Sequence, residues 1–116
     1  MPGRHDFRIT TEVTDDEWAH DIALNLGGAF FCSQAAIPHL LERRGGIVTV
    51  ASVAGLRAAP ESLAYCSSKA ALAMLTQCIA LDHGPAEVRA NCICPGWVRT
   101  PMADAELDAL GLDSRE

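Results

Sequence analysis

Two side chains that could perform acid–base chemistry stand four positions apart in the second half of the chain. Tyr65 is the single tyrosine of the sequence, and Lys69 follows it in a segment with helical character. On a helix, positions i and i+4 share a face, with Cβ atoms about 5–6 Å apart. An ammonium at that distance favours the charged form of a phenol, so the pair could act as a general acid or base. The simpler alternative is that both residues lie on a solvated helix face without a chemical role. Other residues of the sequence are needed to distinguish these two interpretations.

Further candidate residues lie at the ends of two apolar runs and inside a third segment. Ser52 closes the run 47–51, which is typical of a buried strand. Pro95 and Gly96 close a second strand-like run, 88–94, and Asn25 interrupts an apolar helical segment. Each has a structural explanation of its own: a polar residue ends a strand, or an amide satisfies a backbone group of a neighbouring loop. Their order and spacing together are more specific than any one of them.

This ordered set resembles the short-chain dehydrogenase/reductase family over roughly residues 14–102. The shared motifs are an asparagine in an N-L-x-G context, a serine that ends a strand, Y-x-x-x-K, and P-G-x-V-x-T. The resemblance implies an NAD(P)-dependent oxidoreductase that interconverts an alcohol and a carbonyl of a small molecule. It also implies a catalytic set made of Asn25, Ser52, Tyr65 and Lys69.

Each member of that set has a role implied by the resemblance. Tyr65 would be the proton donor or acceptor, and Lys69 would assist it and hydrogen-bond the nicotinamide ribose. Ser52 would donate to the substrate oxygen, while Asn25 would hold a water that links the lysine to solvent. The residues implied to lie against the cofactor are Tyr65, Lys69, Pro95, Gly96, Val98 and Thr100.

The elements that must position these residues alternate between helix and strand. Thr14 and Glu17 form the pattern of a capping box, which opens a long helix predicted to reach 44 and to bend near Pro38. A strand (47–51), a helix (62–83), a second strand (88–94) and a short helix (102–110, with Thr100 as its cap) follow. This order predicts an α/β fold, a partial Rossmann-like doubly wound parallel sheet. We expect a lead-in over 1–13, the C-terminal catalytic part of the domain over 14–111, and a tail over 112–116.

The glycine-rich turn of a dinucleotide-binding fold is not recognisable in the sequence. Gly27-Gly28 and Gly45-Gly46 do not form G-x-x-x-G-x-G after a strand, the position at which such a turn binds pyrophosphate. We therefore interpret the chain as a truncated dehydrogenase that lacks its cofactor-binding first half. Use of NAD or NADP is implied by the family alone.

Composition limits the remaining possibilities. A hydrophobic content of 49% with 21% charged residues indicates a folded globular protein, and the net charge of −6 argues against nucleic-acid binding. No apolar run is long enough to span a bilayer and the first residues lack a signal-peptide core, so we expect a cytoplasmic protein. The histidines are scattered, which predicts no metal site. The odd set of cysteines predicts reduced, buried thiols: Cys32, Cys66, Cys78, Cys92 and Cys94.

The second long helix has apolar residues on two faces, so one face needs a second layer or a partner chain. Leu72, Leu75 and Ile79 mark one face, whereas Ala70, Met74, Cys78 and Leu81 mark the other. In the family that the chain resembles, the helices corresponding to 14–44 and 62–83 form subunit interfaces. The alternative function is accordingly a non-catalytic module that self-associates or joins full-length subunits. A third possibility is the product of a degraded gene that does not fold.

Overall fold

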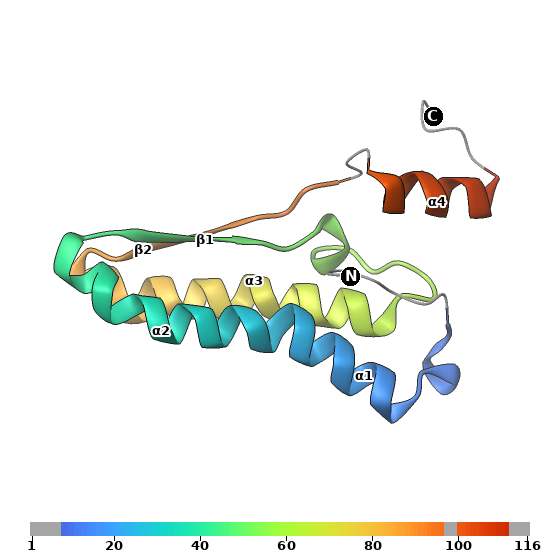
Figure 1. Cartoon of the computed structure of the whole chain (residues 1–116), viewed down its shortest axis with the longest axis horizontal. Helices are drawn as coiled ribbons and strands as arrows, with labels where there is room; N and C mark the ends of the chain where they lie inside the picture. The colour runs from blue at the N-terminus through green and yellow to red at the C-terminus, as the bar shows by residue number, and fades with distance from the viewer. Residues whose placement is uncertain (1–7, 97–99, 112–116) are drawn as a thin grey trace.

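The computed structural model of the chain describes residues 8–96 and 100–111 and has an α/β architecture (Figure 1). The sequence therefore predicted both the fold class and the order of the elements correctly. Short 3-10 turns connect several of the main elements. Those elements are α1 (Asp15–Ile22), the π-helical segment η2 (Ala23–Gly27), α2 (Gly28–Arg43), β1 (Gly46–Val50), α3 (Leu63–His83), β2 (Arg89–Ile93) and α4 (Pro101–Leu110).

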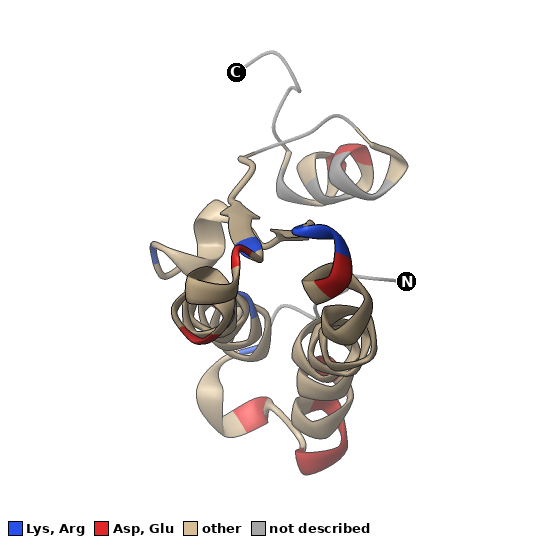
Figure 2. Cartoon of the chain, turned by 90° about the vertical axis from the view of Figure 1, so that its left-hand side faces the viewer, with Lys and Arg blue, Asp and Glu red and all other residues tan. Residues whose placement is uncertain are grey.

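The two strands are parallel, and α3 connects them. Their register pairs Gly46 with Arg89 and Val50 with Ile93. α2 and α3 run beneath the strands on the same side of the sheet (Figures 1 and 2). The strands end in the same direction, so the residues that follow β1 and β2 meet at one edge, as in other parallel α/β sheets.

Only one face of this sheet is covered by the long helices. On that face Thr49 is buried, and its hydroxyl oxygen lies 2.6 Å from that of Thr76 on α3. On the other face Val48, Val50 and Ile93 are more than half exposed, at 63%, 55% and 54%. Parallel sheets are normally buried on both faces. The described residues therefore form an α/β layer that is open on one side.

The overall dimensions agree with this openness. The radius of gyration is 16.0 Å, against about 13.4 Å expected for a compact domain of this length. The accessible surface is 7931 Å², roughly 1,800 Å² more than expected for a compact monomer of this mass. This excess on one chain is larger than the roughly 800 Å² that each partner contributes to an ordinary protein–protein interface.

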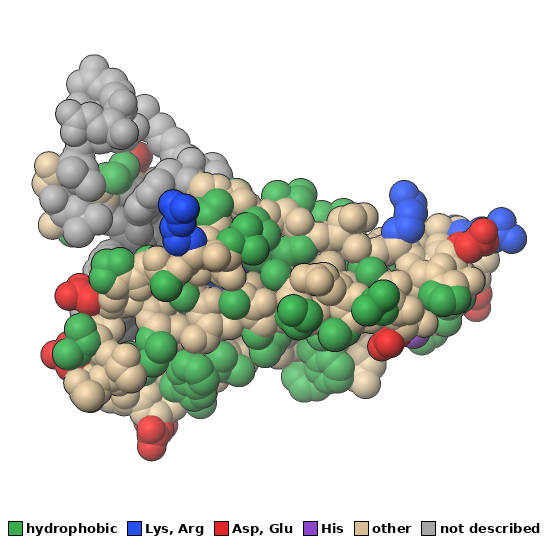
Figure 3. Space-filling view, turned by 180° about the vertical axis from the view of Figure 1, so that it is seen from behind, with side chains coloured by type: hydrophobic (Ala, Val, Ile, Leu, Met, Phe, Trp, Pro, Cys, Tyr) green, Lys and Arg blue, Asp and Glu red, His purple; other side chains and the backbone are tan. Residues whose placement is uncertain are grey.

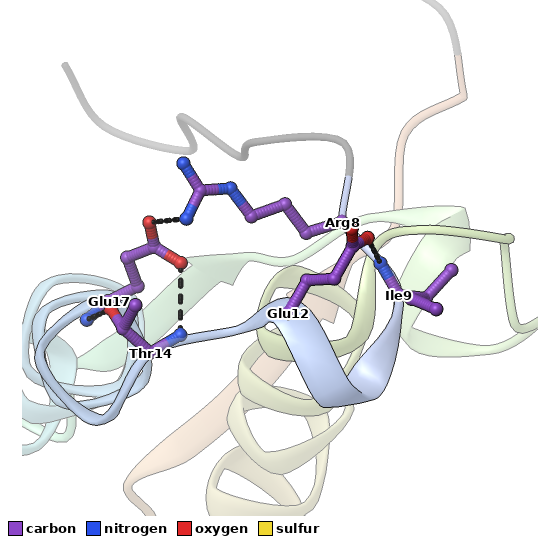
Figure 4. A network of polar contacts seen from close by, with 5 residues as sticks. All are labelled: Arg8, Ile9, Glu12, Thr14 and Glu17. Carbon is purple, nitrogen blue, oxygen red and sulfur yellow. Dashed lines mark hydrogen bonds and ion pairs between the residues drawn. The ribbon is translucent and has the colours of Figure 1, made fainter.

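The start of α1 is held as the capping-box pattern predicts. Thr14 Oγ1 accepts from the Glu17 amide at 3.2 Å, and Glu17 Oε2 accepts from the Thr14 amide at 3.2 Å (Figure 4). Arg8 adds an ion pair to the other oxygen of Glu17, and its amide donates to the carbonyl of Glu61. The described part of the expected lead-in is therefore attached to both α1 and the segment before α3.

The irregularity of the first long helix lies at a different place from the bend expected near Pro38. The hydrogen-bonding pattern changes at Ala23–Gly27, where five residues adopt a π-helical turn, and α2 continues through Pro38 as helix. The sequence predicted an irregularity near Pro38, but the change in helix type lies a dozen residues earlier. A single π-turn inside an α-helix is often found at a functional site.

The cysteines differ from expectation in their burial. All five are free thiols, as predicted, but Cys32 and Cys78 are exposed and the other three are half-buried. The cysteines are exposed for the same reason as one face of the sheet: no second layer of the described residues covers the surfaces on which they lie.

α3 has the predicted two-sided character. Leu72 and Ile79 are buried against the rest of the fold, whereas Met74 and Leu81 are 57% and 78% exposed. Figure 3 shows hydrophobic side chains spread along the face of the molecule that contains α3. None of the described helices has the length and apolar character needed to cross a membrane.

Candidate functional site

Tyr65 and Lys69 lie one turn apart on α3, close to its first turn. The Lys69 ammonium nitrogen is 5.8 Å from the centroid of the Tyr65 ring. The same nitrogen donates a hydrogen bond of 3.3 Å to the carbonyl of Val50, the last residue of β1. Lys69 therefore connects the tyrosine ring to the carboxyl end of the first strand.

The environment of Lys69 disfavours its charge. Partial burial lowers the pKa of Lys69 below the ordinary lysine value, and the electrostatic interaction with the neighbouring Cys92 opposes this by raising it. Because water screens a partly buried ammonium only in part, its positive charge acts more strongly on a neighbouring phenol than it would in open solvent.

Ser52 stands two residues beyond β1 in extended backbone, with φ −163° and ψ 156°. Its hydroxyl oxygen accepts a hydrogen bond of 3.1 Å from the amide of Ala54. Among the residues that the structure describes, we find no acceptor for the proton of this hydroxyl. A half-buried serine in this state can donate to the oxygen atom of a bound ligand.

Asn25 lies in the π-helical turn and is 8% exposed. Its amide nitrogen donates to the Ser68 hydroxyl at 3.2 Å, and Ser68 Oγ donates to the carbonyl of Tyr65 at 2.8 Å. Asn25 therefore contacts the residue next to Lys69 in the helix, and the contact attaches the first long helix to the part of α3 that bears the tyrosine.

The predicted cofactor-side residues follow β2. The Pro95 carbonyl accepts a hydrogen bond of 3.0 Å from the Val53 amide, so the ends of the two strands are joined there. A Cβ at Gly96 would contact nothing within 4 Å. Val98 is outside the described residues. Thr100 precedes α4, and its carbonyl accepts from the Asp104 amide at 2.8 Å, as expected of a residue at a helix start.

Three of the four predicted catalytic residues are thus grouped at one end of the sheet. Ser52 follows β1, and Tyr65 and Lys69 are joined to the end of that strand through Val50. Asn25 lies on the first long helix, beside α3, and reaches the group through Ser68.

A cavity of about 270 Å³ lies next to this group, between the start of α1 and the start of α3. Tyr65 forms part of its wall, together with Arg8, Glu17 and His20. The other three predicted catalytic residues do not line it.

Sequence reasoning missed two features of the site. Ser68 is fully buried and bonds to both Asn25 and the Tyr65 carbonyl. The Cys92 thiol lies near Lys69, and the Cys94 thiol lies near the backbone of Ser52. Burial raises the pKa of Cys94, and the interaction with Cys92 raises it further. The sequence shows that both thiols are at or next to the end of β2, but only the packing of the fold shows which neighbours they have.

The fold is similar to those of dinucleotide-dependent enzymes. A structure of 4-hydroxyisoleucine dehydrogenase complexed with NADH superposes with a TM-score of 0.80 at 34% identity, covering 93% of this chain and 48% of that one. ElxO with NADP bound gives a TM-score of 0.84 at 28% identity, covering 95% of this chain and 44% of that one.

Sequence comparison agrees. Meso-2,3-butanediol dehydrogenase of Serratia marcescens is 40% identical over 102 residues, which cover 88% of this chain and 41% of that protein. The chain thus spans less than half the length of these relatives. The family model for short chain dehydrogenases matches residues 2–110. The chain therefore belongs to the short-chain dehydrogenase/reductase family and covers part of its fold.

Proposed function

We propose that this chain supplies the catalytic part of an NAD(P)-dependent oxidoreductase that interconverts an alcohol and a carbonyl. The observation that carries the proposal is the contact of Lys69 with both the end of β1 and the Tyr65 ring. This contact brings a phenol, an ammonium and the Ser52 segment to the carboxyl end of parallel strands, where ligands of such sheets bind.

Each residue has a part in moving one proton at the substrate oxygen. Tyr65 gives a proton to that oxygen during reduction and removes it during oxidation. Lys69 places its ammonium beside the phenol ring, and the Ser52 hydroxyl donates to the same oxygen and stabilises developing negative charge. Asn25, through Ser68, holds the helix turn that bears the tyrosine. The nicotinamide cofactor, when bound, supplies or accepts the hydride.

The described residues fit one end of such a cofactor. Lys69 offers a cation, and Gly96 leaves open backbone beside the end of β2. We find no glycine-rich turn between a strand and a helix in the described part of the chain. Gly27 and Gly28 lie within the first long helix, Gly45 directly precedes β1, and Gly46 is the first residue of β1. We therefore expect weak cofactor binding by the chain alone, and full activity only together with the remaining part of a dehydrogenase.

Calorimetric titration of the 116-residue chain with NADH and NADPH tests the proposal. We expect weak binding that Lys69→Ala abolishes. Gln77→Ala, an exposed change two turns further along α3, is the matched control and should leave binding unchanged. A folded chain that binds neither nucleotide, or whose binding is indifferent to Lys69→Ala, would defeat the proposal.

Tyr65→Phe separates binding from chemistry. The variant keeps the ring but loses the proton, so it should bind the cofactor like the parent chain and lose turnover of any alcohol or carbonyl that the parent converts. Turnover that survives Tyr65→Phe would remove the tyrosine from the mechanism.

A second role, in self-association, is supported by an apolar groove between α3 and the first long helix, which consists of α1, η2 and α2. The groove has a volume of about 590 Å³ and its wall includes Trp18, Ile22, Leu26, Phe30 and Leu75. A second copy of the chain offers the same helix faces, and a two-fold arrangement would bury both grooves at once. The surface excess of roughly 1,800 Å² is enough for such an interface.

Light scattering across a concentration series tests this role. We expect a dimer that Trp18→Glu converts to a monomer, while Leu56→Glu, on an exposed side chain outside the helices and the groove, leaves the dimer intact. A folded chain that stays monomeric at high concentration contradicts self-association, and a complex formed only with a full-length relative would identify the other partner class.

A further inference from the structure

Gly55 lies directly against the backbone of α3. A Cβ atom at this position would be 2.8 Å from the carbonyl carbon of Lys69, and 2.9 Å from both the Lys69 oxygen and the Ala70 nitrogen. Non-bonded heavy atoms prefer separations of about 3.5–4.0 Å. These three atoms belong to one helical peptide group, which cannot turn aside as the end of a side chain can. The φ angle of Gly55 lies outside the left-handed region, so the contact alone requires glycine.

Gly55 ends a short turn that joins three parts of the candidate site. Ser52 Oγ accepts from the Ala54 amide at 3.1 Å, and the Ser52 carbonyl accepts from the Gly55 amide at 2.9 Å. The Val53 amide donates to the Pro95 carbonyl at 3.0 Å. One turn of 3-10 helix (Val53–Gly55) therefore connects the end of β1, the end of β2 and the Lys69 peptide of α3.

We propose that Gly55 is a positioning residue: its lack of a side chain sets the separation between the Ser52 segment and the Lys69 peptide. Its catalytic meaning rests on the proposed function, whereas the contact itself does not. The two hydrogen bonds within the turn, from the amides of Ala54 and Gly55 to Ser52, transmit any displacement of Gly55 to Ser52. The same displacement would act on the bond between Lys69 Nζ and the Val50 carbonyl, now 3.3 Å long.

Gly55→Ala should move the turn away from α3 by about 0.7 Å or more, the distance needed to restore ordinary contacts. A misplacement of about 1 Å can cost on the order of 100-fold in rate. Solvent would also reach the Lys69 side chain more easily. Because burial is the larger influence that lowers the pKa of Lys69, this pKa should rise in the variant.

Lys69 is the single lysine of the sequence, so a chain labelled with 13C-lysine gives one side-chain signal to titrate. We expect the parent chain to titrate below the ordinary lysine value and Gly55→Ala to titrate higher. Gly28→Ala is the matched control, because a Cβ at Gly28 would meet nothing within 4 Å, and its Lys69 titration should match the parent. Urea unfolding of each variant shows that the folded state is being observed.

A second measurement needs no variant. The parent chain should show a nuclear Overhauser effect between the Gly55 α-protons and the Ala70 amide proton, and this decides the matter if Gly55→Ala does not fold. Absence of that effect, or an unchanged Lys69 titration in a folded Gly55→Ala chain, overturns the positioning role. Both readouts are independent of cofactor, so loss of the proposed function through failed nucleotide binding would be recognised separately.

Discussion

Removing the Thr49 hydroxyl and removing the Thr76 hydroxyl should lower the free energy of unfolding by different amounts. Their oxygens lie 2.6 Å apart and both residues are buried, at 8% and 2% exposed. Thr76 Oγ1 also donates to the carbonyl of Leu72 at 2.8 Å. With its proton committed there, Thr76 accepts the bond and Thr49 donates it.

The two single replacements by valine, which keeps the β-branched shape, therefore have different consequences. Thr76→Val leaves the buried Thr49 proton without an acceptor, which costs about 1–3 kcal/mol of unfolding free energy. Thr49→Val leaves Thr76 bonded to Leu72, so the loss should be nearer the net value of one hydrogen bond, about 0.5–1.5 kcal/mol. The double variant removes both polar groups and should be less destabilised than the sum of the two.

Urea denaturation of the four chains, followed by circular dichroism, gives the complete double-mutant cycle. A Thr49→Val loss equal to or greater than that of Thr76→Val would refute the donor assignment. Additive losses in the double variant would show that the two hydroxyls are not coupled. The pair matters for the site because it fastens α3 to β1 one residue before Val50, the residue that Lys69 bonds.

Three further outcomes are expected. Because burial lowers the pKa of Lys69, the unfolded chain keeps this proton at pH values where the folded chain has lost it. The unfolding free energy of the parent chain should therefore rise with pH just below the ordinary lysine pKa, and this rise should be missing from Lys69→Met in urea titrations at a series of pH values. A rise of equal size in the variant would contradict the assignment to Lys69. Thr14→Ala should lower the unfolding free energy by about 0.5–2 kcal/mol in urea titrations, because it removes an oxygen that caps α1; an unchanged midpoint would contradict that role. Arg8→Ala should cost no more than about 1 kcal/mol, with an effect that fades as salt is added, since both partners of its ion pair with Glu17 are partly exposed.

Local signals in the sequence were sufficient for the elements of the fold. Apolar runs marked both strands to within one residue at each end, and the Thr14–Glu17 pattern marked the start of the first helix, because these features depend on neighbours a few positions away. The π-turn was missed for the opposite reason. The partner of Asn25 in that turn is Ser68, 43 residues along the chain, and no local pattern specifies such a contact.

The chemistry of the candidate site could be inferred from sequence, but its geometry could not. The spacing of Tyr65 and Lys69 follows from the helix alone. Whether Lys69 also reaches the Val50 carbonyl depends on how α3 packs beneath β1. The need for glycine at position 55 is likewise invisible in the sequence, because its cause is a helix backbone that begins eight residues later and folds back against the turn.

The sequence by itself determined the family, the order of helices and strands, and the residue types available for proton transfer, since each depends on residue identity and short-range spacing. Only the tertiary structure decided that the sheet is covered on one face, that the cysteines are not buried, and that one turn joins Ser52, Pro95 and Lys69. These properties depend on which surfaces meet. Contacts between segments far apart in the chain are set by packing, which acts over the whole fold and leaves little trace in any short stretch of residues.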